Sequence, residues 1–525
     1  MAQHIRTLAN NMFREDIKQP YRLTPFIVTF CSTSVSSIDM ENFIEMGLRI
    51  IRFKITNLTR SDRIMLLAKF KQAMKLFCEK FDVPSWPIAI CIDLPNACIK
   101  TGYFGAIKLQ DSNNRRVNFE ENSIVELTCD PKLWNKCSRN RLFMDDPYSF
   151  KMITPGKEIT VGCGKVILNC IEVLNEQTIK CKTIQGGTLG DVEFVCIRGI
   201  THLKPPLSRY DLSMIEFAKE FKLNIIIMNF VRRRKTLDKV KELFKNSPMP
   251  YIVSTICEQE GLDNIDAIIE ASDGIILARE FMAYEIVNKY QMIGIQNQLS
   301  AKCRQRGKPF FVSGNVLEDS LSKGILLDRD LTDITNAALD GTGFVLRHLE
   351  NPANILIAMN VLHSVSKSVE SLQREQSFWR VLDEIRMPVN AAEACCLACA
   401  LAAKQSNSRV ILVPTVTGST ARILSHIAPE VIILTISSNS FVARKLQLLR
   451  GIIPLIYNEQ SKLDFEDDMN SRVAYAINYC VKYNILKYLE TYVLLRRTSV
   501  YSAFADHLSV RTVTSQTSSA WSCAN

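Results

Sequence analysis

Short hydrophobic runs alternate with amphipathic segments along most of the chain, and this alternation constrains the fold more than any other feature. Apolar runs of four to eight residues are typical of buried strands, and apolar residues recurring every three to four positions are typical of helices. Strands are expected at 26–30, 48–53, 87–93, 223–230, 251–255, 273–277, 308–313 and 343–346. Helices are expected at 61–79, 209–221, 235–245 and 283–306. Eight strand–helix units predict an α/β fold built on a parallel (β/α)₈ TIM barrel.

The segment between the third and fourth predicted strands has a different pattern. Residues 98–200 contain short alternating stretches such as "SIVELTC" and "TIKCKTIQG", with glycine turns and few helical patterns. Such a pattern favours antiparallel strands. We therefore expect an all-β, β-barrel-like domain at 98–200, inserted after strand three of a barrel made from 21–97 and 201–385.

A third region begins near residue 386 and again alternates strands with helices. Strands are expected at 410–414, 431–436, 452–457 and 492–496, and helices at 390–405, 418–427, 439–449 and 467–486. Helices on both faces of a short parallel sheet predict an open α/β domain at 386–512. We expect a helical segment at 1–20, and a disordered tail at 513–525 because "SQTSSAWSCAN" is polar.

The composition narrows the class of protein. Hydrophobic residues make up 47% and charged residues 22%, as in a soluble globular protein, and the apolar run "ACCLACALAA" (394–403) is shorter than a membrane span. The first residues lack an apolar signal region, so the 17 cysteines are expected to be reduced in the cytoplasm. The six histidines are far apart, and Cys396 and Cys399 lie in an alanine-rich helix, so zinc is not expected. A net charge of +10 without aromatic interleaving favours a small anionic ligand over nucleic acid.

The ends of the predicted strands should carry any chemistry, because a TIM barrel places its site at the carboxyl ends of its strands. The stretch 252–281 supplies two such ends. The positions just past these strands hold Thr255, Cys257 and Phe281, with no lysine and almost no free carboxylate. The sequence thus predicts the frame of an active site without the usual reactive groups.

Local motifs and the order of the domains resemble the pyruvate kinase family. "MGLRIIRFKITN" (46–57) is similar to G-x-N-x-A-R-x-N-F-S-H, and "IAICIDLPNACIKTG" (88–102) to A-x-D-T-K-G-P-E-I-R-T-G. The stretch 255–281 is similar to K-I-E-N-x-E-G-x-x-N-x-D-E-I-x-x-x-S-D-G-I-M-V-A-R-G-D. "TDITNAALDG" (332–341) and "LLRGIIPLIY" (448–457) resemble further family segments. The resemblance runs from about residue 20 to 510.

The resemblance implies a glycolytic reaction in which a phosphoryl group passes from phosphoenolpyruvate to ADP, giving pyruvate and ATP, with Mg²⁺ and K⁺. It implies that Arg52 contacts the substrate phosphate and that Asp93 and Thr56 are remnants of the K⁺ site. The remaining positions of these two segments differ from the family, with Lys54 for Asn, Asn57 for His, Leu94 for Thr and Lys100 for a nucleotide-facing Arg.

The reacting centre departs further from the family pattern. Thr255 stands at the position where the resemblance implies the catalytic lysine. Cys257 and Phe281 stand at the positions where it implies the two carboxylates that bind Mg²⁺. The neighbouring substrate-binding glycine is Glu280, and the threonine after the next strand is Gly314. A nucleotide-facing lysine of the inserted domain is Glu193, and "LLDRD" (326–330) replaces P-T-R-A-E. A neutral thiol and a phenyl ring cannot replace carboxylates around a hard cation. We therefore expect a catalytically inactive or very weak member of the family that acts as a structural or regulatory partner or binds phosphorylated metabolites.

Alternatives remain open at this point. An active enzyme would need displaced metal ligands such as Glu280 or Glu260. A different reaction on a phosphorylated acid would use a cationic cluster, composed of Arg52, Lys54, Arg232 and Arg279. Lys54 either occupies the K⁺ site and pairs with Asp93 or lies exposed beside an unrelated aspartate, and Cys257 is either an inert thiol or a reactive one near Arg279.

The third domain carries one more family feature. Residues Thr415, Thr417, Gly418, Ser419 and Thr420 resemble the loop T-x-S-G-x-[ST] that binds an effector phosphate, or they form an ordinary N-cap turn. A later effector loop is replaced by "RRTSVYS" (496–502). The helix that contains "EACCLACALAA" matches a family subunit interface, so the resemblance implies a homo-oligomer (tetramer) or a hetero-oligomer with an active relative, and no contact with nucleic acid or membrane.

Overall fold

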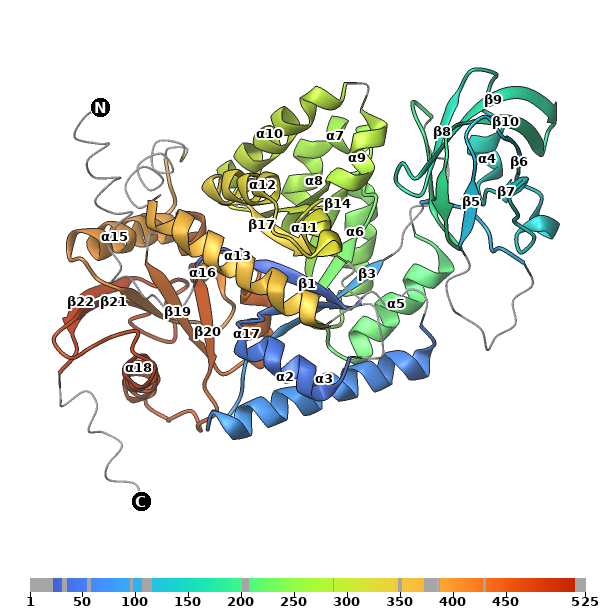
Figure 1. The fold of residues 1–525 in the computed structure, drawn as a ribbon. Helices are drawn as coiled ribbons and strands as arrows, with labels where there is room; N and C mark the ends of the chain where they lie inside the picture. The colour runs from blue at the N-terminus through green and yellow to red at the C-terminus, as the bar shows by residue number, and fades with distance from the viewer. Residues whose placement is uncertain are drawn as a thin grey trace.

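The molecule has three parts, with the barrel in the middle, the inserted domain on one side and the C-terminal domain on the other (Figure 1). The computed structural model describes residues 22–30, 35–53, 58–94, 98–105, 116–200, 207–286, 288–347, 352–372, 385, 388–427 and 431–514. The predicted helical segment at 1–20 and the predicted tail from 515 onward lie outside these residues.

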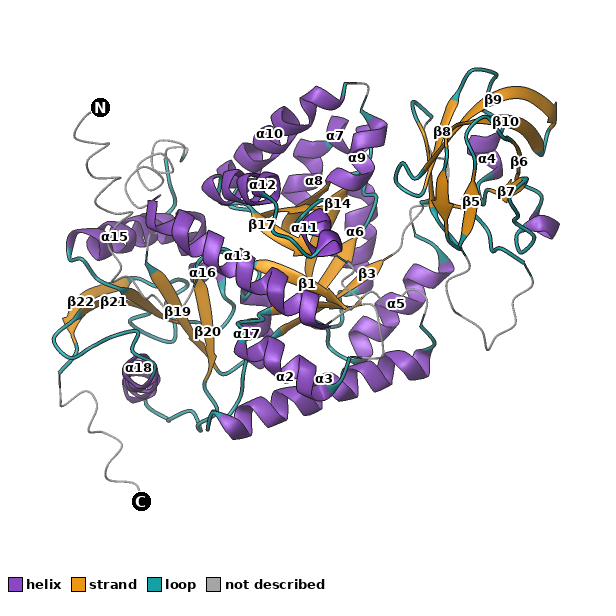
Figure 2. Ribbon diagram, viewed as in Figure 1, coloured by secondary structure: helices purple, strands orange, loops and turns teal. Residues whose placement is uncertain are grey.

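Eight parallel strands close the central barrel in the order β1-β17-β16-β15-β14-β13-β3-β2. Their bounds are β1 Phe26–Phe30, β2 Ile50–Phe53, β3 Ala89–Leu94, β13 Ile225–Met228, β14 Tyr251–Ile256, β15 Gly274–Ala278, β16 Phe310–Ser313 and β17 Gly343–Leu346. Each predicted barrel strand is present, and the (β/α)₈ prediction is confirmed. Helices surround the orange strands of the barrel in Figure 2.

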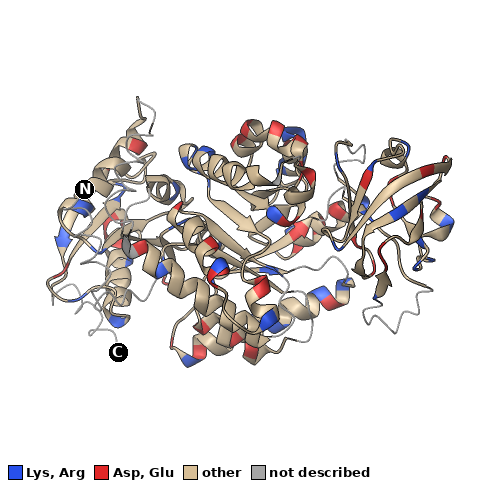
Figure 3. Cartoon of the chain, turned by 45° about the horizontal axis from the view of Figure 1, so that its top comes forward, with Lys and Arg blue, Asp and Glu red and all other residues tan. Residues whose placement is uncertain are grey.

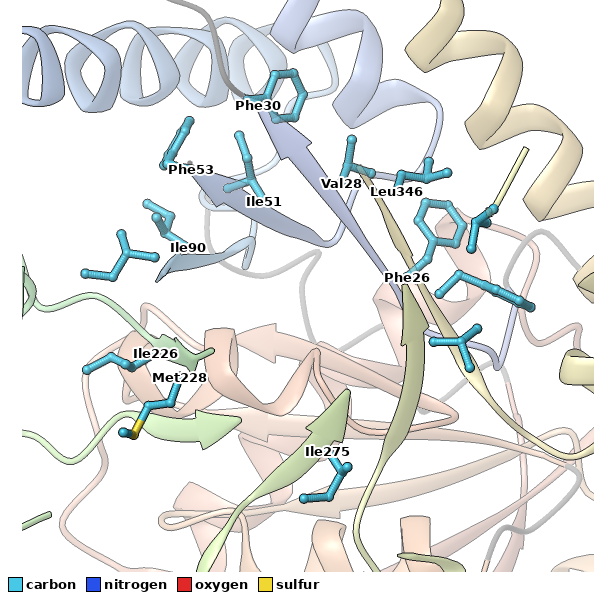
Figure 4. Packing of buried hydrophobic residues seen from close by; sticks show 14 of the residues in the cluster. Phe26, Val28, Phe30, Ile51, Phe53, Ile90, Ile226, Met228, Ile275 and Leu346 are labelled. Atoms are coloured by element: carbon cyan, nitrogen blue, oxygen red, sulfur yellow. The ribbon is translucent and has the colours of Figure 1, made fainter. Parts of the chain in front are cut away.

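Alternation along the strands divides the barrel core into two layers. Outward-facing residues such as Phe26, Val28 and Ile51 pack beneath the surrounding helices (Figure 4). The residues between them, such as Ile27 and Ile50, belong to a separate cluster that fills the barrel interior. Because both faces of each strand are buried, the strands have nearly continuous apolar sequences, which is why they could be predicted.

Local signals in the sequence begin several of the surrounding helices. Capping boxes start α2 (Ser37–Glu45), α3 (Arg60–Lys80) and α5 (Arg209–Glu220), in which an N-cap hydroxyl and an aspartate three residues later exchange hydrogen bonds. Further helices of the barrel include α6 Arg234–Leu243, α7 Gln259–Asp263, α8 Ile265–Ala271, α11 Glu318–Lys323, α12 Asp328–Leu339 and α13 Pro352–Leu372.

The helix predicted at 283–306 is wrong, because this segment contains three separate pieces. They are the end of α9 (Arg279–Glu285), a 3₁₀ turn η2 (Lys289–Gln291) and α10 (Met292–Gln305). Ile286 has extended dihedral angles, with φ −71° and ψ 139°, and ends α9. The side chain of Asn288 then accepts a hydrogen bond from the Tyr290 N–H at 3.0 Å. Asparagine favours such a turn over a continuous helix.

The inserted domain lies between β3 and β13 in the chain and consists mainly of strands. Its larger sheet has the order β4-β12-β8-β9-β10-β6-β7, and β11 pairs with β5. The strands are β4 Ile99–Lys100, β5 Val117–Phe119, β6 Ile124–Thr128, β7 Arg141–Phe143, β8 Glu158–Val161, β9 Val166–Asn175, β10 Thr178–Gln185, β11 Gly187–Leu189 and β12 Phe194–Ile197. An antiparallel bridge joins Thr101, directly after β4, to Met144, directly after β7, and the Asp145 N–H donates to the Lys100 carbonyl at 3.0 Å, so the two edge strands of the larger sheet approach each other. The domain has its own buried core.

The C-terminal domain is an open sheet in the order β20-β19-β18-β21-β22. Its elements are α15 Ala391–Gln405, β18 Val410–Pro414, α16 Ser419–Ile427, β19 Ile432–Ser437, α17 Ser440–Leu446, β20 Ile452–Ile456, α18 Phe465–Lys482, β21 Thr491–Arg496 and β22 His507–Thr512. The antiparallel strand β22 was not predicted, because "HLSVRT" lacks an apolar run. Val513 is fully buried in this domain, which therefore extends past residue 512.

The C-terminal domain also closes the end of the barrel at which the strands begin. Leu448, which follows α17, belongs to the internal barrel cluster and lies 3.6 Å from the position that a Cβ on Gly274 would occupy. The neighbouring Gln447 side chain donates a hydrogen bond to the Pro87 carbonyl at 2.7 Å. One end of the barrel is therefore sealed, and the opposite end is the place for a site.

Charges of both signs are interspersed over all three parts in the view of Figure 3. No disulfide joins any two cysteines in the part of the chain that the structure describes. A search of the same residues finds no helix with the length and apolar character of a membrane span.

Candidate active site

Strand alternation places a set of polar side chains at the carboxyl end of the barrel, pointing inward. Residues two positions apart on a strand face the same way. Each of these polar residues lies two positions after a residue of the internal cluster: Arg52 after Ile50, Asp93 after Cys91, Thr255 after Val253 and Ser313 after Phe311. The predicted positions Arg52, Asp93 and Thr255 therefore face the barrel axis at the same end of the barrel.

Arg52 and Asp93 form a two-bond ion pair. Arg52 Nε lies 2.7 Å from Asp93 Oδ1, and Arg52 Nη2 lies 2.5 Å from Asp93 Oδ2. The two side chains are only 13% and 3% exposed. The pair neutralises both the predicted phosphate-binding cation and the predicted K⁺ ligand. Lys54, Thr56 and Asn57 lie outside the described residues, and Leu94 is buried.

Thr255 and Cys257 bring no charge to the site. The Thr255 hydroxyl is buried without a hydrogen-bond partner among the described residues. Cys257 is buried, and burial raises the pKa of its thiol well above the ordinary value, with further raising by Glu280 and Glu258. The thiol is therefore protonated at neutral pH, which favours the inert reading of this cysteine over a reactive one.

Phe281 lies in an aromatic cluster at the position expected for the second carboxylate. Its ring centroid is 4.7 Å from that of Phe194 and 5.2 Å from that of Phe230. Cys98, Cys257 and Ala278 belong to the same apolar cluster. Cys257 and Phe281, the two positions at which the resemblance implies metal carboxylates, thus face one apolar region.

Glu280 is held beside Gly314. The Ser313 hydroxyl donates to the Glu280 carboxylate at 3.1 and 3.2 Å, and Arg347 Nη1 lies 3.0 Å from Glu280 Oε1. Gly314 has φ +79°, and a Cβ on it would lie 2.2 Å from Glu280 Oε2. The carboxylate therefore occupies the space that a side chain at position 314 would need.

Arg279 connects the loops after β15 and β16. Its Nε and Nη2 donate to the Gly314 carbonyl at 3.1 and 2.9 Å, and its Nη1 lies 2.8 Å from Asp333 Oδ1. The side chain is 8% exposed. The Arg279 guanidinium therefore links the Gly314 carbonyl to the Asp333 carboxylate, which is a structural role.

The remaining predicted charges at this end also have partners. Arg232 Nε lies 3.4 Å from Glu258 Oε2, and both side chains are nearly buried. Glu260, a candidate displaced metal ligand, accepts a hydrogen bond from Arg233 at 2.6 Å. The described members of the proposed cationic cluster, Arg52, Arg232 and Arg279, are therefore divided among separate ion pairs.

The residues present do not fit Mg²⁺. Magnesium requires oxygen ligands, usually carboxylates, around an octahedral site. The thiol of Cys257 is protonated, Phe281 offers no donor atom, and Glu280 is engaged by Arg347 and Ser313. No group of three or more His, Cys, Asp or Glu side chains that could hold a metal is found in the part of the chain that the structure describes.

Lys100 and Glu193 lie close together in the inserted domain. The Thr101 N–H, next to Lys100, donates to the Glu193 carbonyl at 2.8 Å. The Glu193 carboxylate accepts from Lys165 Nζ at 2.7 Å. Lys165 therefore lies beside Glu193, which stands at the position where the resemblance implies a lysine, but the Lys165 ammonium is paired with the Glu193 carboxylate.

The predicted effector loop leads into α16, and residues of the loop form hydrogen bonds with one another. The Gly418 N–H donates to Thr415 Oγ1 at 3.0 Å, and the Ser419 N–H donates to Thr417 Oγ1 at 3.4 Å. Thr417 Oγ1 also donates to Ser419 Oγ at 3.2 Å. These bonds are those of a capping turn, in which threonine hydroxyls satisfy the first N–H groups of the helix.

Three contributors to the site were not predicted. Arg347 follows β17, so the strand-end rule used above would have identified it. Burial alone would lower the pKa of Arg347, but Glu280 and Glu318 outweigh burial and raise it. Phe230 is the last residue of the strand predicted at 223–230, so the same strand-end rule would have identified it. Phe194 had no sequence signal, because nothing local shows that a strand of the inserted domain reaches the barrel.

Comparisons with known proteins match the barrel together with its inserted domain, and also the C-terminal domain. The family description "Pyruvate kinase, barrel domain" matches residues 21–353, and "Pyruvate kinase, alpha/beta domain" matches residues 393–510. A pyruvate kinase of Candida albicans is 27% identical over 76% of this chain and 79% of its own length. Human pyruvate kinase PKLR is 25% identical over 87% of this chain and 79% of its own. A pyruvate kinase of Kluyveromyces lactis is 23% identical over 92% and 95%.

Proposed function

Because the chain belongs to the pyruvate kinase family, we propose that it keeps the family scaffold without carrying out the family reaction at a useful rate. The family reaction transfers a phosphoryl group from phosphoenolpyruvate to ADP, and the family uses Mg²⁺ and K⁺. One observation carries the proposal. The ring of Phe281 packs against Phe194 and Phe230 where the resemblance implies a metal carboxylate.

The chemistry of the neighbouring groups supports the same proposal. Phosphoryl transfer depends on cations that neutralise the charge of the moving group. Thr255 offers no ammonium, and Arg52 is neutralised by Asp93. Removing one preorganised charge stabiliser costs about 10²–10³ in rate, and losses within one site are not additive. Several are lost here together.

A coupled assay of pyruvate formation tests this proposal. The protein and human pyruvate kinase PKLR are assayed side by side with phosphoenolpyruvate, ADP, Mg²⁺ and K⁺. We expect turnover lower by at least about 10⁴-fold. Turnover within about a hundredfold of the human enzyme would favour the alternative of an active enzyme with displaced ligands. Glu280→Gln and Glu260→Gln would then identify the ligand.

Binding of a phosphorylated metabolite is the weaker form of the proposal. Arg52, Arg232 and Arg279 each have a carboxylate partner, so a phosphate would have to displace one. Thermal unfolding with and without phosphoenolpyruvate tests it. A rise in the melting temperature that Arg52→Met abolishes would support an anion site, and we expect no rise.

We place the functional role in assembly in the cytoplasm, as a homo-oligomer or as a subunit beside an active relative. The separate buried cores of the barrel, the inserted domain and the C-terminal domain support this role, because the scaffold is intact where the reacting centre is not. Native mass spectrometry of the purified protein, alone and mixed with an active pyruvate kinase from the same organism, distinguishes a homo-oligomer, a mixed oligomer and a monomer. A monomer under both conditions contradicts the assembly role.

A further inference from the structure

The inserted domain touches the barrel through more than its two chain crossings. We define the aromatic joint as Phe194, Phe230 and Phe281. Phe194 is the first residue of β12 in the inserted domain, whereas Phe230 follows β13 and Phe281 lies in α9 of the barrel. All three pairs of ring centroids are 4.7 to 5.2 Å apart. Such distances are those of aromatic side chains in direct contact.

A second contact lies beside the joint and depends on shape. Gly164, in the turn after β8, has φ +85°, and a Cβ on it would lie 2.0 Å from the Tyr284 hydroxyl oxygen. Tyr284 belongs to α9, as Phe281 does. The tyrosine ring therefore fits against the bare backbone of this glycine, and a larger residue would separate the two surfaces.

Polar bonds surround these apolar contacts. The Cys196 thiol donates to Glu285 Oε1 at 2.9 Å, and Arg198 Nε donates to the Tyr284 carbonyl at 3.2 Å. Arg347 lies over the Phe281 ring, with 5.8 Å from the guanidinium carbon to the ring centroid. The helix α9 thus contacts β12 and the residue after it, through apolar contacts at Phe281 and hydrogen bonds at Tyr284 and Glu285.

Two domains connected by short crossings move relative to each other unless a substantial apolar interface joins them. We propose that the aromatic joint holds the inserted domain on the barrel in a single orientation, whether or not a ligand is present. The ring of Phe281 then has a structural task at the place where the family resemblance implies a metal ligand. This proposal concerns conformation, so it stands or fails independently of the proposed lack of turnover.

Single-molecule energy transfer between the two domains measures this orientation. Tyr148 in α4 (Pro147–Phe150) of the inserted domain is 62% exposed, and Tyr290 on the barrel is 95% exposed. A genetically incorporated amino acid at both positions accepts the dyes without labelling cysteines. We expect one narrow distribution, unchanged by phosphoenolpyruvate, ADP or Mg²⁺. A broad distribution, two populations or a shift on adding these ligands would overturn the proposal.

Variants of the joint provide the matched comparison. Phe194→Ser and Phe281→Ser are expected to raise the population outside the narrow peak by at least tenfold. Phe281→Leu keeps an apolar contact and is expected to retain most of the peak. Trp134→Ser removes a partly exposed aromatic residue of the same domain outside the joint and should leave the peak unchanged. Circular dichroism confirms that each variant is folded, and a narrow peak in a folded Phe281→Ser variant contradicts the role of the joint.

Discussion

Both carboxylate oxygens of Asp93 accept hydrogen bonds from Arg52, at 2.7 and 2.5 Å, although the two residues are 41 positions apart in the chain. The pair joins β2 to β3 at the end of the barrel where a substrate would enter. The family resemblance implies that Arg52 contacts a phosphate and that Asp93 is a remnant of a K⁺ site. In the folded chain they satisfy each other.

Removing one member of this pair is expected to destabilise the fold more than removing both. Arg52→Met leaves a buried carboxylate without its partner, which costs about 3–5 kcal/mol. The double variant Arg52→Met with Asp93→Leu replaces the ion pair by apolar groups and is expected to recover at least half of that loss. Urea unfolding gives the free energies. A double variant no more stable than Arg52→Met alone would show that the pair is not the source of the effect.

Glu280 and Gly314 are expected to be energetically coupled. Gly314→Thr introduces the residue that the family resemblance implies here, but it places a β-branched side chain at φ +79° and against the Glu280 carboxylate. We expect a loss of about 2–5 kcal/mol from backbone strain and overpacking. Glu280→Gly opens the space, so the double variant should lose less than the sum of the two single variants by about 1 kcal/mol or more. Simple additivity in denaturant unfolding would contradict the shared space.

Carboxylates introduced at the two lost positions are expected to create a metal-dependent protein. Cys257→Glu with Phe281→Asp buries two negative charges and should lower the melting temperature without metal. Mn²⁺ that binds only the folded variant should then raise the melting temperature. At a free Mn²⁺ concentration one hundred times the dissociation constant, it adds about 2.7 kcal/mol to the free energy of unfolding. Cys257→Gln with Phe281→Asn is the uncharged control. The original protein should not respond to Mn²⁺ in thermal unfolding or in electron paramagnetic resonance titrations, and a response would contradict the misfit described above.

His363 is expected to make the fold sensitive to mild acid. Burial and the positive charges of Arg22, Lys367 and Arg49 lower the pKa of this histidine to about 4. The unfolded chain therefore takes up a proton near pH 6.5, whereas the folded chain does not until about pH 4. Stability from this group is complete above pH 6.5 and is lost as the pH falls toward 4. Solvent screening of a partly exposed side chain leaves an effect of about tenfold in the folding equilibrium.

Denaturant unfolding between pH 7 and pH 4 measures this dependence. His363→Gln removes the titrating group and should flatten this part of the curve. An identical slope in the variant would assign the acid sensitivity to other groups.

The loop before α16 is expected not to bind a sugar bisphosphate. Its first N–H groups already bond to the hydroxyls of Thr415 and Thr417, and a phosphate would have to replace these bonds. Thermal unfolding with millimolar fructose 1,6-bisphosphate should show no rise in melting temperature. A rise that disappears in Thr415→Ala with Thr417→Ala would establish an effector site here.

The elements of the barrel could be predicted from the sequence because their signals are local. A strand buried on both faces has a continuous apolar run, and a helix such as α3 begins with a capping box formed by residues three positions apart. The antiparallel strand β22 had neither kind of signal and was missed. The break after α9 was missed because it depends on a single turn at Asn288.

The residue types Thr255, Cys257 and Phe281 were also known from the sequence, because side-chain chemistry does not depend on the fold. Their neighbours in space were not. Phe194 comes from the inserted domain, and its contact with Phe281 depends on how two domains meet. The pairing of Glu280 with Arg347 likewise depends on the closure of the barrel, which brings distant strand ends together.

The sequence by itself therefore determined the order of strands and helices, the family and the residue types Thr255, Cys257 and Phe281 at the strand ends. Only the tertiary structure decided that Arg52 pairs with Asp93, that Glu280 fills the space over Gly314 and that Phe281 packs against Phe194 and Phe230. Periodicity and residue type act over a few positions of the chain. Partners in an ion pair or an aromatic cluster are chosen by the packing of segments far apart in the chain.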